Sequence, residues 1–291
     1  MFEGCGFRKK REYTTPFTSI EHSEKSGYSF YMEADKRQDI RRGLFLFLAI
    51  AVVVFLFIVP CQSADPAGKR PGAKPEAAQG GERRMLDAIK WLGHASILIE
   101  WEGRHVYIDP WKLQKPKNKA DLILVTHTHH DHYSPADIKS ITTPSTILIA
   151  PVDVLTAEKT GNKQAISPGK EIDLGWIKVV AVPAYNLKKE FHPKSKGWVG
   201  YLLTFSGTTI YIAGDTDYIP EMKKIKADIL FLPVGGTYTM DAQEAAEAVN
   251  TINPKIAIPI HFGDVVGTRE DAETFRSLVK SAKVKILTPS Q

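Results

Sequence analysis

Four histidines and one aspartate stand almost side by side in the hexapeptide HTHHDH, which begins at His127. His127 and His129 are two residues apart, so on extended backbone their side chains can point the same way. Asp131 and His132 follow in a turn and can face a neighbouring position. Imidazole and carboxylate groups bind zinc and similar ions, and a bound water can then become hydroxide near neutral pH. The spacing predicts two adjacent metal sites, with His130 out of step and facing outwards.

The elements around this cluster are expected to position it. The preceding segment DLILVT is apolar and β-branched, as in a buried strand, and α/β folds place chemistry at the carboxyl ends of strands. Strand-like runs cover 89–101, 105–111, 121–127, 145–150, 177–184, 198–205, 208–215, 227–234 and 255–262. Fewer helix-like stretches lie between them, at 134–141, 151–160, 219–226, 240–252 and 269–282. The alternation indicates a layered α/β sandwich.

HTHHDH resembles the H-x-H-x-D-H signature of the metallo-β-lactamase superfamily, and the similarity continues downstream. Asp215 ends the run TTIYIAGD, where that family has a bridging carboxylate, and His261 follows KIAIPI. The resemblance covers about residues 86–291 and implies a four-layer αββα sandwich with the metals at one edge of the two sheets. WLGHAS and YIDPW look most like the branch that contains ascorbate-phosphate lactonase and N-acyl-phosphatidylethanolamine phospholipase D.

The resemblance also implies a role for each residue of the metal site. It implies one ion held by His127, His129 and one further histidine, a second ion held by Asp131, His132 and His261, and Asp215 as the bridge between them.

The third motif departs from the family pattern. The family usually has a histidine after a strand like IKVVAVPA, whereas this chain has Ala-Tyr-Asn at 184–186. His192 is the only histidine between His132 and His261, so it is the candidate for the missing ligand. The alternative is that His192 contacts substrate or caps a loop, which would leave the first metal site weak or empty.

A second group of residues is expected near the metal edge. The candidate substrate contacts are His94, Tyr185, Asn186 and Tyr238. His94 and Asp109 fall at strand ends or turns, where they could instead hydrogen-bond to metal ligands. Asp109 before a proline also fits an ordinary turn.

The chemistry implied by the resemblance is hydrolysis. A hydroxide that bridges two divalent ions, zinc by default with manganese or iron as alternatives, would attack an ester, lactone or phosphodiester bond. Asp131 would orient this nucleophile or accept its proton. Fold does not decide the substrate. Two other interpretations stay open: a membrane-tethered metal- or ligand-binding accessory protein with the same fold and little catalysis, and redox chemistry at a diiron site.

An uninterrupted apolar run at 44–59 follows several basic residues. Its length lies between that of a signal-peptide core and the roughly 20 residues of a spanning helix, so a signal anchor and a cleaved signal peptide both stay open. Met32 opens a stretch that would form a signal peptide by itself, and Cys61 offers a lipidation site as a further alternative. We therefore expect an exported protein, membrane-anchored or periplasmic.

The predicted order of the segments is a basic N-terminal segment (1–42), a signal anchor or signal peptide (43–61), a flexible linker (62–84) and a metallo-β-lactamase-fold hydrolase domain (85–291). The linker is rich in proline, glycine and alanine and has no apolar periodicity.

Charge and cysteine content limit the classes of partner and of metal ligand that we expect. The whole chain has a formal net charge of +5, but residues 86–291 carry 24 Lys and Arg against 23 Asp and Glu. A nucleic-acid-binding domain usually has a basic excess on its folded part, so nucleic acid is not expected. The expected partners are a small-molecule or lipid-like substrate and, through the N-terminal apolar segment, a membrane. Because no cysteine follows Cys61, metal in the folded part must be bound by histidine and carboxylate.

Overall fold

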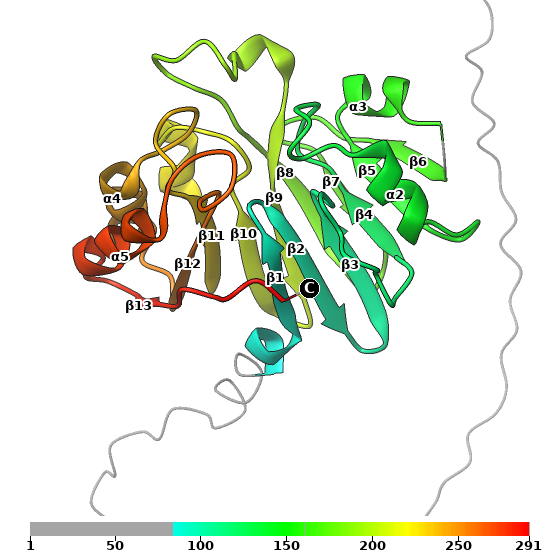
Figure 1. Ribbon diagram of the computed structural model, residues 1–291, viewed down its shortest axis with the longest axis horizontal. Helices are drawn as coiled ribbons and strands as arrows, with labels where there is room; N and C mark the ends of the chain where they lie inside the picture. The colour runs from blue at the N-terminus through cyan, green and yellow to red at the C-terminus, as the bar shows by residue number, and fades with distance from the viewer. Residues whose placement is uncertain (1–83, 160, 291) are drawn as a thin grey trace, which may run out of the picture. The chain divides into compact units, whose positions relative to one another are not determined.

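The computed structural model of this 291-residue chain describes residues 84–159 and 161–290. All of them belong to the compact unit 69–291, whose centre consists of two mixed β-sheets (Figure 1). The predicted basic and apolar segments, 1–42 and 43–61, and the linker up to residue 83 lie outside the described residues. In the part of the chain that is described, no helix is both long enough and apolar enough to cross a membrane.

The first sheet has six strands in chain order. They are β1 (Ile89–Gly93), β2 (Ser96–Trp101), β3 (Arg104–Ile108), β4 (Leu122–Leu124), β5 (Ile147–Ala150) and β6 (Asn162–Ala165). The pairs among β1, β2 and β3 are antiparallel, and those from β3 to β6 are parallel. Helix α2 (Pro135–Ile141) connects β4 to β5, and α3 (Val152–Ala157) connects β5 to β6.

The second sheet has seven strands in the order β13-β12-β11-β10-β9-β8-β7. They are β7 (Glu171–Asp173), β8 (Lys178–Pro183), β9 (Val199–Phe205), β10 (Thr208–Ile212), β11 (Ile229–Pro233), β12 (Ile256–Ile260) and β13 (Lys283–Val284). Pairs from β7 to β10 are antiparallel, and pairs from β10 to β13 are parallel. The connections contain the 3-10 turns η1 (Lys194–Lys196) and η2 (Pro220–Lys224) and the helices α4 (Ala242–Ile252) and α5 (Arg269–Leu278).

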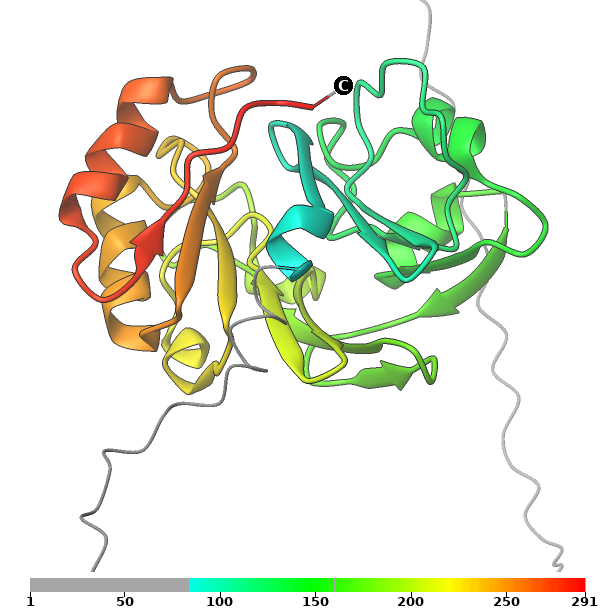
Figure 2. The same ribbon diagram turned by 90° about the horizontal axis from the view of Figure 1, so that it is seen from below.

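The two-residue period of a strand sorts the side chains of β2 between two cores. Ile97 and Ile99 belong to the larger core, which also contains the buried residues of the second sheet. Leu98 points the other way and shares a smaller core with Ile138 of α2 and Val154 of α3. The two sheets therefore face each other, with α2 and α3 outside the first sheet and α4 and α5 outside the second (Figure 2).

The predicted α/β fold is confirmed, each of its two sheets is mixed, and each of the nine strand-like runs contains a strand. Two details differ. The run 89–101 is a hairpin of two strands rather than one element, and the helix-like stretch 219–226 forms only the short 3-10 turn η2. The sequence did not predict β6, β7 or β13, which are all edge strands.

The ends of strands from different sheets approach each other closely at one edge. The Tyr201 hydroxyl in β9 donates to the main-chain oxygen of Val125 at 2.7 Å, just after β4. Gly214, which follows β10, has a φ of +65°, and a Cβ there would lie 2.9 Å from the main-chain oxygen of Val199 and 3.3 Å from Cβ of Thr126, which follows β4 in the other sheet. Glycine is required where backbones pack this tightly in a left-handed conformation. This close approach brings the segments after β4 and β10 together.

Candidate metal centre

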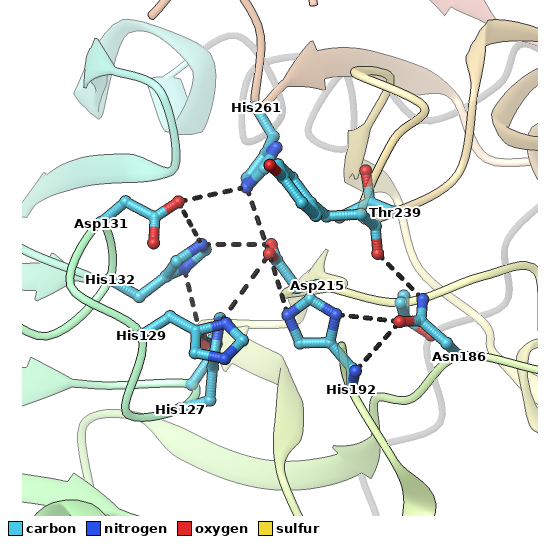
Figure 3. A network of polar contacts seen from close by, with 12 residues as sticks. His127, His129, Asp131, His132, Asn186, His192, Asp215, Thr239 and His261 are labelled. Atoms are coloured by element: carbon cyan, nitrogen blue, oxygen red, sulfur yellow. Dashed lines mark hydrogen bonds and ion pairs between the residues drawn. The ribbon is translucent and has the colours of Figure 1, made fainter. Parts of the chain in front are cut away.

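The histidine-rich segment follows directly from the carboxyl end of β4. His127 lies just beyond the strand, and the chain then turns, because the main-chain N–H groups of His132 and Tyr133 both donate to the main-chain oxygen of His129, at 3.0 and 2.8 Å. This turn directs His127 and His129 to one position and Asp131 and His132 to a second. Asp215 after β10 and His261 after β12 reach the same edge from the second sheet (Figure 3).

The first cluster consists of His127, His129, His192 and Asp215, with one ligand atom of each lying within 4.8 Å of all the others. His192 Nε2 is 3.2 Å from Asp215 Oδ2, and His127 Nε2 is 3.9 Å from the same oxygen. His192 thus lies where the sequence analysis needed a third histidine. Trp198 flanks the cluster, with its ring centroid 5.0 Å from that of His127.

The second cluster consists of His94, Asp131, His132 and His261, again with ligand atoms within 4.8 Å of one another. His261 Nε2 lies 3.7 Å from Asp131 Oδ2. His94 Nε2 lies 3.0 Å from the same oxygen, in hydrogen-bonding geometry. From the sequence, His94 is expected to contact substrate or a ligand, and the structure places it within the cluster itself.

Asp215 contacts both clusters. Its Oδ1 lies 3.2 Å from His132 Nε2, and its Oδ2 lies 3.2 Å from both His192 Nε2 and His261 Nε2. These three Nε2 atoms and Asp215 Oδ1 are buried, yet none has a hydrogen-bond partner. Buried polar atoms without a partner are costly. Nitrogen and oxygen atoms that converge without bonding to each other fit divalent cations between them, and Asp215 is placed to bridge two.

Asp109 and Thr126 orient one histidine in each cluster. Asp109 Oδ2 lies 2.8 Å from His132 Nδ1 and accepts a hydrogen bond from the Thr126 hydroxyl at 2.7 Å. Because that hydroxyl uses its hydrogen on Asp109, it must accept from His127 Nδ1, 2.9 Å away. In its neutral form each ring therefore carries the proton on Nδ1 and presents the Nε2 lone pair to its cluster, as metal-binding histidines do. The sequence analysis considered Asp109 for this role but missed Thr126, whose only signal is its position between a buried strand and the first histidine.

Three residues of the site have strained backbone. The φ angles of His94, Asp109 and His261 are +50°, +45° and +60°. Left-handed backbone is uncommon for residues with a side chain, and such strain is concentrated at functional sites. The main-chain N–H of His261 donates to the main-chain oxygen of His94 at 2.9 Å, so two strained residues hold each other in place.

In the metal-free site, burial and neighbouring carboxylates shift the histidine pKa values in opposite directions. Burial lowers the pKa of His127 well below its usual value and that of His94 to about 4, so both rings are neutral ligands at pH 7. Burial also acts to lower the pKa values of His132 and His261, but neighbouring carboxylates together outweigh it: Asp215 and Asp109 raise the pKa of His132, and Asp215 and Asp131 raise that of His261. Although burial opposes it, the neighbouring His261 and His94 imidazoles lower the pKa of Asp131.

The other candidates lie in different surroundings. Tyr185 is buried and its hydroxyl donates to Glu221, so its placement gives no support to the predicted substrate contact. Asn186 is also buried and contacts His192 rather than open space. Tyr238 is partly exposed and packs edge-on against Phe191, with ring centroids 4.7 Å apart. The His130 side chain is 81% exposed, which agrees with its expected outward direction.

Comparison with known proteins places this geometry in a family. Residues 88–261 match the Beta-lactamase superfamily domain. The chain is 36% identical over 209 residues to the UPF0173 metal-dependent hydrolase of Caldivirga maquilingensis, covering 66% of this chain and 89% of that protein. A similar relative from Thermoplasma acidophilum is 35% identical over 218 residues, covering 69% and 94%.

Solved structures agree. A structure from Parabacteroides distasonis has 34% sequence identity and a TM-score of 0.62, covering 70% of this chain and 93% of the other. Igni18 from Ignicoccus hospitalis shares the fold at 24% identity, with a TM-score of 0.58 and coverage of 70% and 95%. None of these matches distinguishes the lactonase and phospholipase branch that the sequence resemblance suggested. The chain belongs to the metallo-β-lactamase superfamily and, within it, to the UPF0173 family of metal-dependent hydrolases.

Proposed function

We propose that this protein is a hydrolase that uses two divalent metal ions, zinc by default, to cleave an ester, lactone or phosphodiester bond. The observation that carries the proposal is the position of Asp215, whose two oxygens face unpartnered histidine nitrogens of both clusters at 3.2 Å. Two ions bound there would lower the pKa of a bound water and polarise the bond to be cut.

Residues of the two clusters would have further roles in the proposed reaction. Both clusters are buried, apart from the half-buried His129, so the site excludes bulk water from its ligands. The lowered pKa of Asp131 makes its carboxylate a weak base, which favours orienting the attacking water over storing its proton. The second oxygen of Asp131 lies 3.9 Å from Nδ1 of the exposed His130, on the solvent side of the cluster.

Exposed apolar side chains in the loop that contains His192 support a substrate with an apolar part. Leu187 and Phe191, which are 53% and 47% exposed, lie in the same loop as His192, and Phe191 packs against Tyr238. An acyl or aryl group bound here would lie beside the first cluster. With a matched pair of short-chain and long-chain esters, Phe191→Ala should raise KM for the long-chain ester only, and an equal effect on both would count against this contact.

The decisive experiment is a substrate screen of the purified protein with added Zn or Mn, covering lactones, carboxylic esters, phosphodiesters and β-lactams. Hydrolysis of one class that disappears in His132→Ala would support the proposal. Two bound ions per chain with no hydrolysis of any class would favour the alternative, a metal- or ligand-binding accessory protein.

Membrane attachment and export are also proposals, supported by the apolar run at 44–59. Fractionation of cells that express the full chain, with protease added from outside, tests both. Recovery in the soluble cytosolic fraction would refute them.

A further inference from the structure

Asn186 is hydrogen-bonded to the histidine that stands six residues later (Figure 3). Its Oδ1 lies 3.0 Å from Nδ1 of His192 and 3.0 Å from the main-chain N of the same residue. Its Nδ2 donates to Asp217 Oδ1 and to the main-chain oxygen of Tyr238, both at 2.9 Å. All the hydrogen-bonding positions of this buried amide are therefore used.

This arrangement fixes the tautomer of His192. Because Nδ2 of Asn186 faces two acceptors and Oδ1 faces a main-chain N–H donor, the amide cannot be turned over without three repulsive contacts. Oδ1 can only accept, so His192 Nδ1 must carry a proton. In the neutral ring, Nε2 then keeps its lone pair, which faces Asp215 Oδ2 at 3.2 Å.

Asn186 is itself held by a second layer of contacts. Asp217, which is 3% exposed, also accepts from the main-chain N–H of Leu187 at 2.8 Å and from Lys189 Nζ at 2.7 Å. Lys189 donates further to the main-chain oxygen of Thr239 at 2.8 Å. The loops after β8, β10 and β11 thus meet around one amide group, and the His192 ring is fixed from behind.

We propose that Asn186 is a positioning residue that holds the His192 ring with Nε2 facing the first cluster, so that a histidine from the loop completes a metal site. The inference rests on the proposed metal function but concerns metal affinity, not the bond that is cut. Partners of this kind typically change metal affinity by about 10- to 100-fold when they are removed.

The first test compares Asn186→Ala with Asn250→Ala. Asn250 is a matched control because its side-chain oxygen also accepts two hydrogen bonds, from the main-chain N–H groups of Lys280 and Ser281, but it lies in α4 outside both clusters. Both variants and the wild type are titrated with Zn²⁺, and bound metal is counted after dialysis. Asn186→Ala should keep one tightly bound ion and bind the other about 10- to 100-fold more weakly. Two wild-type affinities in Asn186→Ala would overturn the inference.

A double-mutant cycle separates positioning from general destabilisation. In a His192→Ala background, Asn186→Ala should cause no further loss of Zn²⁺ affinity, because the ring that it positions is gone. An equal loss in both backgrounds would mean that Asn186 acts on the fold and not through His192.

A measurement on the wild type keeps the inference testable if the variants do not fold. Nitrogen chemical shifts of His192 in the metal-free protein should show a proton on Nδ1, and a neutral ring protonated on Nε2 would refute the proposal. None of these three tests measures hydrolysis. Loss of one Zn²⁺ site in Asn186→Ala together with an inactive wild type would therefore disprove the proposed function and leave this inference standing.

Discussion

Replacing Asp109 by asparagine should weaken both metal sites at once. The carboxylate of Asp109 is 1% exposed and orients His132 directly and His127 through the Thr126 hydroxyl. An asparagine of the same shape has only one acceptor oxygen. In the wild type the main-chain N–H of Thr126 donates to Asp109 Oδ1 at 2.7 Å. If the asparagine oxygen accepts this hydrogen bond in the variant, the asparagine NH₂ group faces His132 Nδ1. His132 would then carry its proton on Nε2, pointing into the second cluster.

The magnitude follows from these contacts. Loss of an orienting partner costs about 10- to 100-fold in metal affinity, or roughly 1.4 to 2.8 kcal/mol per site. The second site should lose more, since its ligand His132 contacts Asp109 directly. The metal-free protein should also lose about 1.5 to 3 kcal/mol of unfolding free energy for the charge-assisted hydrogen bond to His132.

Zinc titration with competition by a chelator measures the Zn²⁺ affinity of both sites, and two further variants are compared to interpret the result. Thr126→Val removes the relay to His127 but keeps the direct contact between Asp109 and His132, so it should weaken the first ion more than the second. Asp121→Asn is the control: Asp121 also accepts from a main-chain N–H, that of His105 at 2.8 Å, but on the surface. If Asp109→Asn bound both ions as the wild type does, the orienting role of Asp109 would be refuted.

Three further predictions concern protons and packing. The folded metal-free protein raises the pKa values of His132 and His261, so their stabilising contribution is complete below pH ~6.5 and is lost as pH rises through the raised values. Over the same range Zn²⁺ affinity should increase, because the ion displaces these protons. The melting temperature of the metal-free protein measures the first effect, and proton release in calorimetry measures the second. Gly214→Ala should cost at least roughly 1 to 2 kcal/mol more in urea unfolding than Gly207→Ala, because both have positive φ but only Gly214 lies against main chain of β9. Tyr201→Phe should cost about 1 to 3 kcal/mol by leaving a buried main-chain oxygen without its 2.7 Å donor, and an unchanged unfolding midpoint would refute this.

Central strands could be predicted from the sequence because they are buried on both faces. β4, β11 and β12 consist of fully buried apolar residues, and such runs stand out in any sequence. β6 (NKQA), β7 (EID) and β13 (KV) are three of the four edge strands of the two sheets and are mostly exposed or partly exposed. Edge strands commonly carry polar and charged residues, so nothing in their composition distinguishes them from loops.

The site residues also fall into those whose place the sequence predicts and those whose place it does not. Residues of HTHHDH, with Asp215 and His261, follow directly from buried strands, so their approximate place was fixed once the strands were recognised. His94 lies in the turn of a hairpin, and its membership of the second cluster depends on contact with Asp131, 37 residues away in the chain. Neither hydrophobic period nor local spacing carries information about that distance.

The strained residues explain why the site depends on the whole sandwich. His94, Asp109 and His261 each adopt a backbone conformation that costs an L-residue roughly 1 to 2 kcal/mol, so no local segment would hold them alone. Asp109 is held by Thr126 across the β3–β4 pair, within the first sheet. His261 follows β12 of the second sheet and is held by the main chain of His94 in the β1–β2 turn of the first, so this contact forms only when both sheets are packed together. Metal affinity should therefore report the integrity of the whole fold, because a change that separates the sheets would release this strain and disperse the ligands together.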